Sequence, residues 1–328
     1  MKNLLFLSLA GMLCFCACTS ESDPIPANDG KVKVRFQLDV RPDIVAFGTR
    51  SMPSDNTLPA EPQSANTTTP EPGEDQDLPE TDPKAEQSTF SFLEYIVFNE
   101  DEEVVRQQQY ENEGSGTESM EITDEFTPGI YTICFLAHSS DDVELEGTGL
   151  TFPSSVSECF YCSDNFEVVI GDDILKSFTL KRIVSRVEFV PKDTIPEEVA
   201  SFKITTSGIY NTFNLISGYA TEETTPFTLE KTFTETDRNA EQKIVHSFYT
   251  FVPQTDEPDG KATLESALLQ ALNTESEAER EKTIRDIPIY ANRITRYTGN
   301  LYTNINDANF TIEIDTQWGE TIEEIIED

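Results

Sequence analysis

Basic residues are scarce in this sequence of 328 residues. Lys and Arg total 23 against 61 Asp and Glu, which gives a formal net charge of −38. Such a field repels nucleic acid and anionic membrane surfaces, so neither is expected as a partner. We interpret the charge as a means of keeping an exposed surface protein soluble.

Motifs for catalysis and cofactor binding are missing as well. The sequence contains no glycine-rich phosphate loop, no G-x-S-x-G elbow and no H-E-x-x-H pair. The two histidines, His138 and His246, fall on predicted strands, where a structural or surface role is expected. Paired carboxylates carry no information in so acidic a chain. The sequence therefore predicts no enzyme, no cofactor and no metal site.

Only three of the six cysteines lie beyond the first 18 residues, namely Cys134, Cys159 and Cys162. Cys159 and Cys162 have the C-x-x-C spacing, but no second pair and no nearby histidine completes a zinc site, and no βαβ context suggests a redox motif. We predict a structural disulfide, either within this pair or from one member to Cys134, with free thiols as the alternative. An odd number leaves at least one thiol unpaired.

Long apolar runs are also absent. The run from Leu4 to Phe15 follows a charged start and is shorter than the roughly 20 residues of a membrane-spanning helix. It fits a secretory signal over residues 1–17. A small residue, Ala17, precedes Cys18, as lipoprotein processing requires, whereas Cys14 and Cys16 follow bulky residues. We predict lipidation of Cys18 and a membrane anchor of acyl chains, followed by a tether over residues 18–30. The alternative is an ordinary cleaved signal.

Strand patterns dominate what remains. From Lys31 to Arg41 apolar residues alternate strictly with polar ones, which predicts a half-buried strand. Residues 48–87 are rich in Pro, Thr, Glu and Asp and predict a disordered loop. Further strands are expected in a first domain over residues 31–192, at 90–98, 104–105, 130–137, 166–170 and 177–190. A second domain over 193–328 is expected to hold strands at 202–206, 212–216, 227–233, 244–252, 284–290, 296–302 and 310–314.

The segment from Thr263 to Thr283 differs because leucines recur at helical spacing, so we predict one amphipathic helix or a mobile insertion there. Many short strands separated by turn residues predict an all-β chain of two antiparallel β-sandwich domains in tandem. The sole tryptophan, Trp318, is expected to pack into the second core.

Three stretches resemble the fimbrillins and fimbrial anchor lipoproteins of Bacteroides-type bacteria, which build type V pili. They are Phe126–Thr132 (FTPGIYT), Leu180–Phe189 (LKRIVSRVEF) and Ile287–Tyr302 (IPIYANRITRYTGNLY), the last followed by Phe310–Asp315 and Trp318. The acidic Glu21 and Asp23 resemble the signal that sends such lipoproteins to the cell surface. The resemblance implies two transthyretin-like sandwiches and a structural role in a surface fimbria on the outer membrane, with other fimbrial subunits as partners and with a host or bacterial surface ligand for adhesion.

In that family an arginine-directed protease removes the first strand, and a strand from the next subunit fills the groove. Arg50 stands where such a cut would fall, in the predicted loop after the first strand. The alternative is that Arg50 is an ordinary solvated residue. Only an acidic tail, Gly319 to Asp328, follows Trp318, and it is short to serve as a donor strand, so we expect an anchor or accessory subunit that keeps its lipid.

Two other functions compete with this one. A surface glycan-binding lipoprotein that serves an outer-membrane polysaccharide importer could use a similar scaffold, although the single tryptophan offers little for sugar stacking. A hydrolase is disfavoured by the missing motifs.

Overall fold

The computed structural model describes residues 30–40, 90–112, 119–240, 243–303, 310–317 and 320–324. The first half of the chain contains β1 (Val32–Val40), β2 (Phe92–Phe98), β3 (Val104–Glu111), β4 (Ser119–Phe126), β5 (Gly129–His138), β6 (Glu144–Glu146), β7 (Gly149–Thr151), β8 (Phe160–Val168), β9 (Ile174–Arg182) and β10 (Ser185–Pro191). The second half contains β11 (Ser201–Ile209), β12 (Thr212–Asn214), β13 (Tyr219–Ala220), β14 (Thr225–Thr232), α1 (Glu235–Asn239), β15 (His246–Thr250), β16 (Ala262–Leu272), β17 (Ala278–Ile289), β18 (Arg293–Gly299), β19 (Thr311–Gln317) and β20 (Glu320–Glu324).

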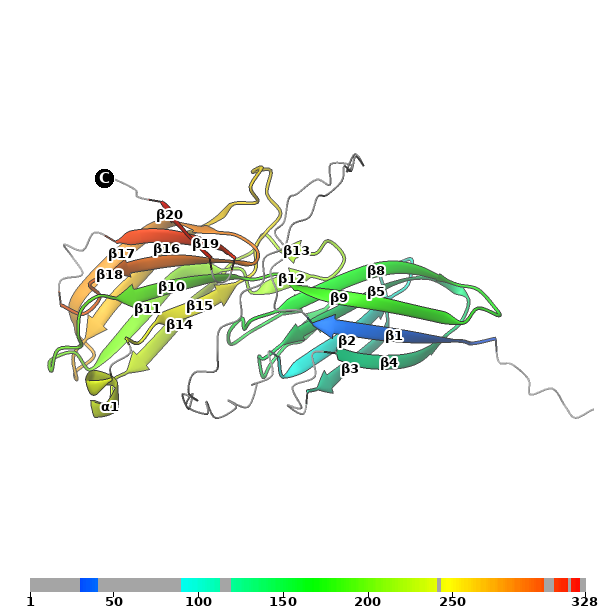
Figure 1. Cartoon of the computed structure of the whole chain (residues 1–328), viewed down its shortest axis with the longest axis horizontal. Coiled ribbons are helices and arrows are strands. Elements are labelled where there is room, and N and C mark those ends of the chain that lie inside the picture. The colour runs from blue at the N-terminus through cyan, green and yellow to red at the C-terminus, as the bar shows by residue number, and fades with distance from the viewer. Residues whose placement is uncertain are drawn as a thin grey trace, which may run out of the picture.

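The chain is an all-β protein built of sandwich-like domains, as the sequence predicted (Figure 1). In the first sandwich, seven strands follow the order β3-β2-β5-β8-β9-β1-β4. Strands β8 and β9 pair only at Phe160–Arg182 and Tyr161–Lys181, so the sheet bends there into two facing layers. Their inner faces enclose one apolar core, to which β1 contributes alternate residues.

The second sandwich consists of two sheets that face each other. One has five strands in the order β15-β10-β18-β19-β20, and the other has four in the order β14-β11-β16-β17. The sheets are antiparallel as predicted, except for one parallel pair in each sandwich, β1 with β9 and β10 with β18. In both pairs, the first strand of the sandwich is inserted beside a strand from much later in the chain, and such a long connection permits parallel pairing.

The helix predicted between Thr263 and Thr283 is wrong, because β16 and β17 form a hairpin there. The leucine spacing also fits period two once the alanines are counted, since Ala267, Leu269 and Ala271 are buried in alternation. Pairing of β16 with β11 on one side and β17 on the other decides for the strand.

A small sheet, β13-β12-β7-β6, joins the sandwiches because two of its strands come from each half of the chain. Aromatic rings pack across this joint, with Tyr161 against Phe213 and Phe152 against Phe251 at centroid distances of 4.8 and 5.2 Å. The chain changes from one sandwich to the other at Ile183 and Val184, which split the strand predicted over 177–190 into β9 and β10. Within the described residues no helix has the length and apolar character to span a bilayer.

Candidate functional site: the first strand and its neighbours

Strand β1 supplies the centre of the first core. Val32, Val34, Phe36, Leu38 and Val40 are all buried, with Phe36 fully enclosed. The Phe36 ring lies 5.8 to 6.4 Å, centroid to centroid, from five aromatic rings of β2, β4, β5, β8 and β9, namely Tyr95, Phe126, Phe135, Phe166 and Phe178. A single side chain of β1 therefore contacts aromatic rings from five other strands of this core.

Both edges of β1 are paired. It runs antiparallel to β4, with Val32 opposite Phe126, and parallel to β9, with Val34 opposite Ile174. In the sheet order β4 is terminal and has β1 as its sole ladder partner within the described residues. Strand β1 is thus the link between β4 and the rest of the sheet.

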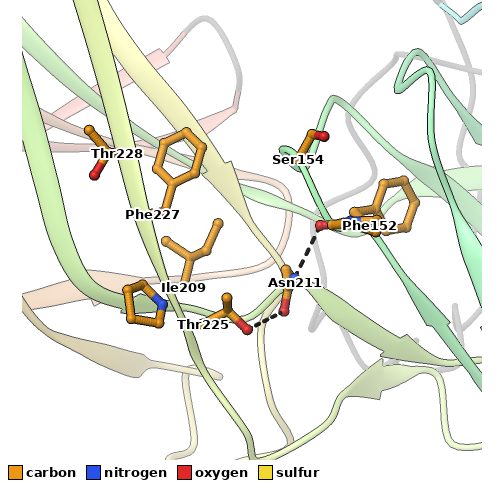
Figure 2. A pocket seen from close by; sticks show the side chains of 9 residues that line it. Phe152, Ser154, Ile209, Asn211, Thr225, Phe227 and Thr228 are labelled. Atoms are coloured by element: carbon orange, nitrogen blue, oxygen red, sulfur yellow. Dashed lines mark hydrogen bonds between the residues drawn. The ribbon is translucent and has the colours of Figure 1, made fainter.

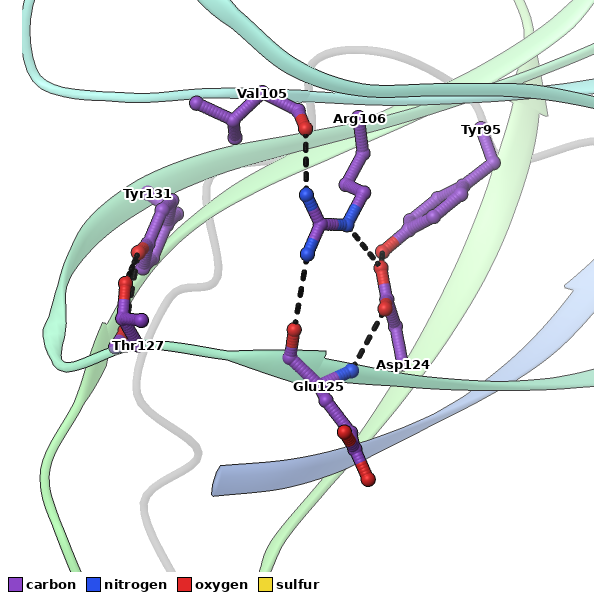
Figure 3. A network of polar contacts seen from close by, with 7 residues as sticks. All are labelled: Tyr95, Val105, Arg106, Asp124, Glu125, Thr127 and Tyr131. Carbon is purple, nitrogen blue, oxygen red and sulfur yellow. Dashed lines mark hydrogen bonds and ion pairs between the residues drawn. The ribbon is translucent and has the colours of Figure 1, made fainter. Parts of the chain in front are cut away.

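A polar network holds β4 from the opposite layer (Figure 3). The Tyr95 hydroxyl donates to Asp124 at 2.9 Å, and Arg106 pairs with the same carboxylate at 3.2 Å. Arg106 also donates to the Val105 and Glu125 carbonyl oxygens. Because β3 and β4 are the two ends of the bent sheet, these bonds close its open side. They hold β4 through contacts that do not involve β1.

Burial raises the pKa of Tyr95, and the neighbouring Asp124 raises it further. The hydroxyl therefore stays protonated and remains a donor at neutral pH. The sequence patterns predict no role for Tyr95, Arg106 or Asp124, and β4 is a strand beyond those predicted. The alternation of Met120, Ile122 and Phe126 with polar residues was the signal that could have found the strand.

The three cysteines are free thiols, which was the alternative to the predicted disulfide. Cys134 lies opposite Ser163, while Cys162 lies opposite Phe135, so their side chains point to opposite faces of the sheet. Cys159 is four positions along the ladder from Ser163, roughly 13 Å of strand, whereas a disulfide needs Cα atoms within about 7 Å.

These thiols are poor nucleophiles. Burial raises the pKa of Cys134 to about 12 and raises the pKa values of Cys159 and Cys162 as well. Cys134 donates to the Leu215 carbonyl at 3.3 Å, and Tyr161 donates to the same oxygen. Cys134 thus belongs to the joint between the sandwiches.

Both histidines are buried structural residues. His138 accepts from the Ser140 amide at 3.2 Å and lies 3.4 Å from the Glu94 carboxylate, joining β5 to β2. His246 hydrogen-bonds the Tyr302 hydroxyl at 2.8 Å. Burial lowers the pKa of His246 to about 4.

A hollow beside the joint is lined by Phe152, Ile209, Asn211, Thr225 and Phe227, among others (Figure 2). Its volume of about 120 Å³ is below the roughly 300 Å³ at which ligand sites begin. Asn211 donates to the Phe152 carbonyl at 3.1 Å and accepts from Thr225 at 3.0 Å, so its amide is already occupied. In the described ranges, no group of three His, Cys, Asp or Glu side chains is placed to hold a metal.

Cys18, Arg50 and Trp318 lie outside the described residues, as does the predicted loop over 48–87. Lipidation, cleavage and the packing of the tryptophan therefore stay predictions.

A sequence model of one protein family matches residues 142–327, more than half of the chain. Its description is a family of unknown function, DUF6562. The chain belongs to this family. The matched part of this DUF6562 member begins just before β6 and includes the joint, β8 and β9 of the first sandwich and the second sandwich, while β1 to β5 precede it. No curated protein sequence matches the chain.

Solved structures with a similar arrangement include fimbrial proteins and a candidate polysaccharide-binding protein. A candidate polysaccharide-binding protein (DUF1812) of Bacteroides thetaiotaomicron has 12% identity and a TM-score of 0.46, covering 74% of this chain and 92% of its own. The tip fimbrial protein Mfa3 of Porphyromonas gingivalis, with a C-terminal truncation, has 11% identity and a TM-score of 0.42, covering 88% and 100%. The fimbrial anchor protein Mfa2 of the same organism has 11% identity and a TM-score of 0.41, covering 72% and 91%.

Proposed function

We propose that this DUF6562 member is a structural subunit of a bacterial surface fimbria, lipidated on Cys18, which performs no chemistry and works by docking to other subunits. The observation that supports it most directly is the position of β1. One strand, with five buried side chains, lies between β4 and β9 and completes a core whose other walls are built by the rest of the sandwich. A site of this form suits strand-mediated recognition, in which main-chain hydrogen bonds give affinity and alternate side chains fill pockets.

The sequence resemblance to fimbrial anchor lipoproteins points to the same role, and within it we favour an anchor or accessory subunit on the outer membrane. The C-terminal segment supports this choice, because Glu320–Glu324 form β20 and pair with β19 of their own sheet. A strand that is already paired within its own subunit is poorly suited to serve as a donor strand for another subunit. An anchor that keeps its lipid also keeps β1, so Arg50 is then left uncut.

The N-terminus of protein isolated from native outer membranes tests the role. An anchor has a blocked, acylated Cys18, whereas a polymerising subunit has a new terminus at Ser51. An unmodified terminus elsewhere contradicts both forms of the proposal.

Capture experiments test the partner class. We expect the full-length protein to retain fimbrial subunits from the same cells and to bind no immobilised glycan. Glycan binding without any fimbrial partner would overturn the proposal in favour of a surface glycan-binding lipoprotein.

A further inference from the structure

Exposed apolar side chains gather at one end of the first sandwich. Val169 and Ile170 are 48% and 63% exposed, and Ile130 and Leu175 on the adjoining strands are 47% and 50% exposed. Single exposed apolar residues are ordinary on a protein surface, but a cluster of them marks an interaction site. We call these four residues the apolar tip.

The turn between β8 and β9 presents the tip outward. The Asp172 amide donates to the Val169 carbonyl at 3.2 Å, and Gly171 has a positive φ of 94°. This combination fits a type II turn, in which glycine at the third position leaves the second residue, Ile170, at the apex. The turn therefore places Ile170, the most exposed large apolar side chain among the described residues, at the tip of a hairpin.

The apolar tip and the start of β1 lie at the same end of the molecule, away from the second sandwich (Figure 1). Parallel pairing places Val34 beside Ile174, which directly follows the β8–β9 turn. Gly30 is twelve residues after Cys18, so even a fully extended tether spans at most about 40 Å. A lipid on Cys18 thus holds this end of the protein close to the bilayer.

The charged residues around the apolar tip determine which lipid headgroups it suits. The turn contains Asp172 and Asp173, and Arg35 of β1 pairs with Asp173 at 3.2 Å. Lys176 pairs with Asp164 nearby. Arg35 and Lys176 are each paired with one carboxylate. Lys31 and Lys33 at the start of β1 add two positive charges, and Glu167 and Asp172 add two negative ones. This end is therefore close to neutral, so a zwitterionic headgroup layer suits it better than an anionic one.

We propose that the apolar tip inserts into the headgroup layer of the bilayer that holds the Cys18 lipid, giving the protein a second membrane contact beside its acyl chains. This inference rests on the proposed lipid anchoring. Amphipathic surface elements bind membranes by placing apolar side chains at the boundary between headgroups and acyl chains. Two contacts orient the first sandwich on the membrane, so that the second sandwich points away toward partner subunits.

The test uses the full lipidated chain in phosphatidylcholine vesicles that carry brominated acyl chains, which quench tryptophan on contact. Ile170→Trp places a probe at the apex. Tyr219→Trp is the matched control, because Tyr219 is 44% exposed but lies in β13 at the joint. The unsubstituted chain, whose single tryptophan is Trp318, supplies the background spectrum. Circular dichroism verifies that both variants keep the β-sheet content of the parent.

We expect bromolipid to quench most of the added Ile170→Trp emission and little of the Tyr219→Trp emission. If the protein floats with the vesicles and Ile170→Trp stays unquenched, the inference is overturned while lipid anchoring stands. If the protein does not float and mass spectrometry finds Cys18 without acyl chains, the proposed anchoring itself fails. Emission that shifts with protein concentration instead of bromolipid content would assign the tip to contacts between copies and would also overturn the inference.

Discussion

The two sandwiches insert their first strands in the same way but secure them differently. β1 and β10 each lie between an antiparallel neighbour and a parallel strand from later in the chain. At β10 both ends are fastened by side bonds, since the Ile183 amide donates to the Cys159 carbonyl just before the strand and Lys192 donates to Gly299 just after it. β1 is held by its two ladders, by its buried face and by bonds between exposed side chains, among them Arg35 with Asp173 and Ser177 with Gln37. Bonds between exposed side chains contribute little, so β1 suits exchange better than a strand whose ends are bonded through the backbone.

The strongest test of this difference between β1 and β10 is to remove one buried aromatic ring from each strand. Phe36→Ala and Phe189→Ala each delete a fully buried ring from the first strand of a sandwich, and each should lower the free energy of unfolding by about 3–5 kcal/mol. Hydrogen exchange should differ between them. In Phe36→Ala we expect fast exchange confined to β1 and β4, because β4 has no other ladder partner among the described strands.

In Phe189→Ala the β10 amides should stay protected until global unfolding, because both ends of the strand remain bonded. Lys33→Ala, an exposed position on β1, is the control and should change stability by less than about 0.5 kcal/mol. Equal exchange in the two aromatic variants would show that the strands are secured alike.

Acid should weaken the second sandwich through His246, which pairs with Phe189 of β10. Burial lowers the pKa of His246 to about 4 in the folded chain, from 6.5 in the unfolded one. Between these values the unfolded state binds a proton that the folded state does not. Stability is therefore full above pH 6.5 and falls as pH drops toward 4, in total by about 3 kcal/mol.

Denaturant unfolding of the parent and of His246→Gln at pH 7 and pH 4 measures the contribution of His246 to this loss of stability. The many carboxylates titrate equally in the two proteins, so their contribution cancels. We expect the stability difference between parent and variant to shrink by about 3 kcal/mol on acidification. If the stability difference between parent and variant does not change with pH, His246 does not cause the loss of stability in acid.

Asp193 fastens the end of β10 and allows a finer test. Its carboxylate accepts from the backbone amides of Leu301, Tyr302 and Thr303 and from the Thr303 hydroxyl, at 2.8 to 3.0 Å. Because hydrogen bonds to a charged group contribute more than neutral ones, Asp193→Ala should cost about 2–3 kcal/mol in thermal or denaturant unfolding. Asp193→Asn, which keeps one acceptor oxygen, should cost less. If Asp193→Asn is as stable as the parent, the carboxylate charge is irrelevant to the bonds that hold the end of β10.

The sequence predicted strands well where one face is buried and less well elsewhere. Lys31 to Arg41 alternates because β1 has one face in the core, whereas β2 is buried on both faces and reads as a continuous apolar run. The sequence of the β16–β17 hairpin predicts a helix or a mobile insertion instead, because alanine and leucine fit either period until the sheet partners are known. Tyr95, Arg106 and Asp124 could not be grouped from sequence, since only the bend between β8 and β9 brings β3 and β4 together.

The smallest expected effect concerns the polar network that holds β4. It tests whether β4, which forms one side of the β1 site, keeps its position through contacts other than those with β1. Tyr95→Phe removes the hydroxyl that donates to Asp124 while keeping the ring that packs on Phe36. Because Arg106 still pairs with Asp124, we expect stability to fall by only about 1 kcal/mol in denaturant unfolding. Hydrogen exchange should nevertheless quicken at β4 more than at β1, since the hydrogen bond from Tyr95 to Asp124 holds β4 directly and does not involve β1. Tyr219→Phe, at an exposed ring, controls for removal of a hydroxyl and should change neither quantity. If exchange in Tyr95→Phe quickens at β1 and β4 alike, then β4 depends on β1 for its position, and the site loses its wall whenever that strand leaves.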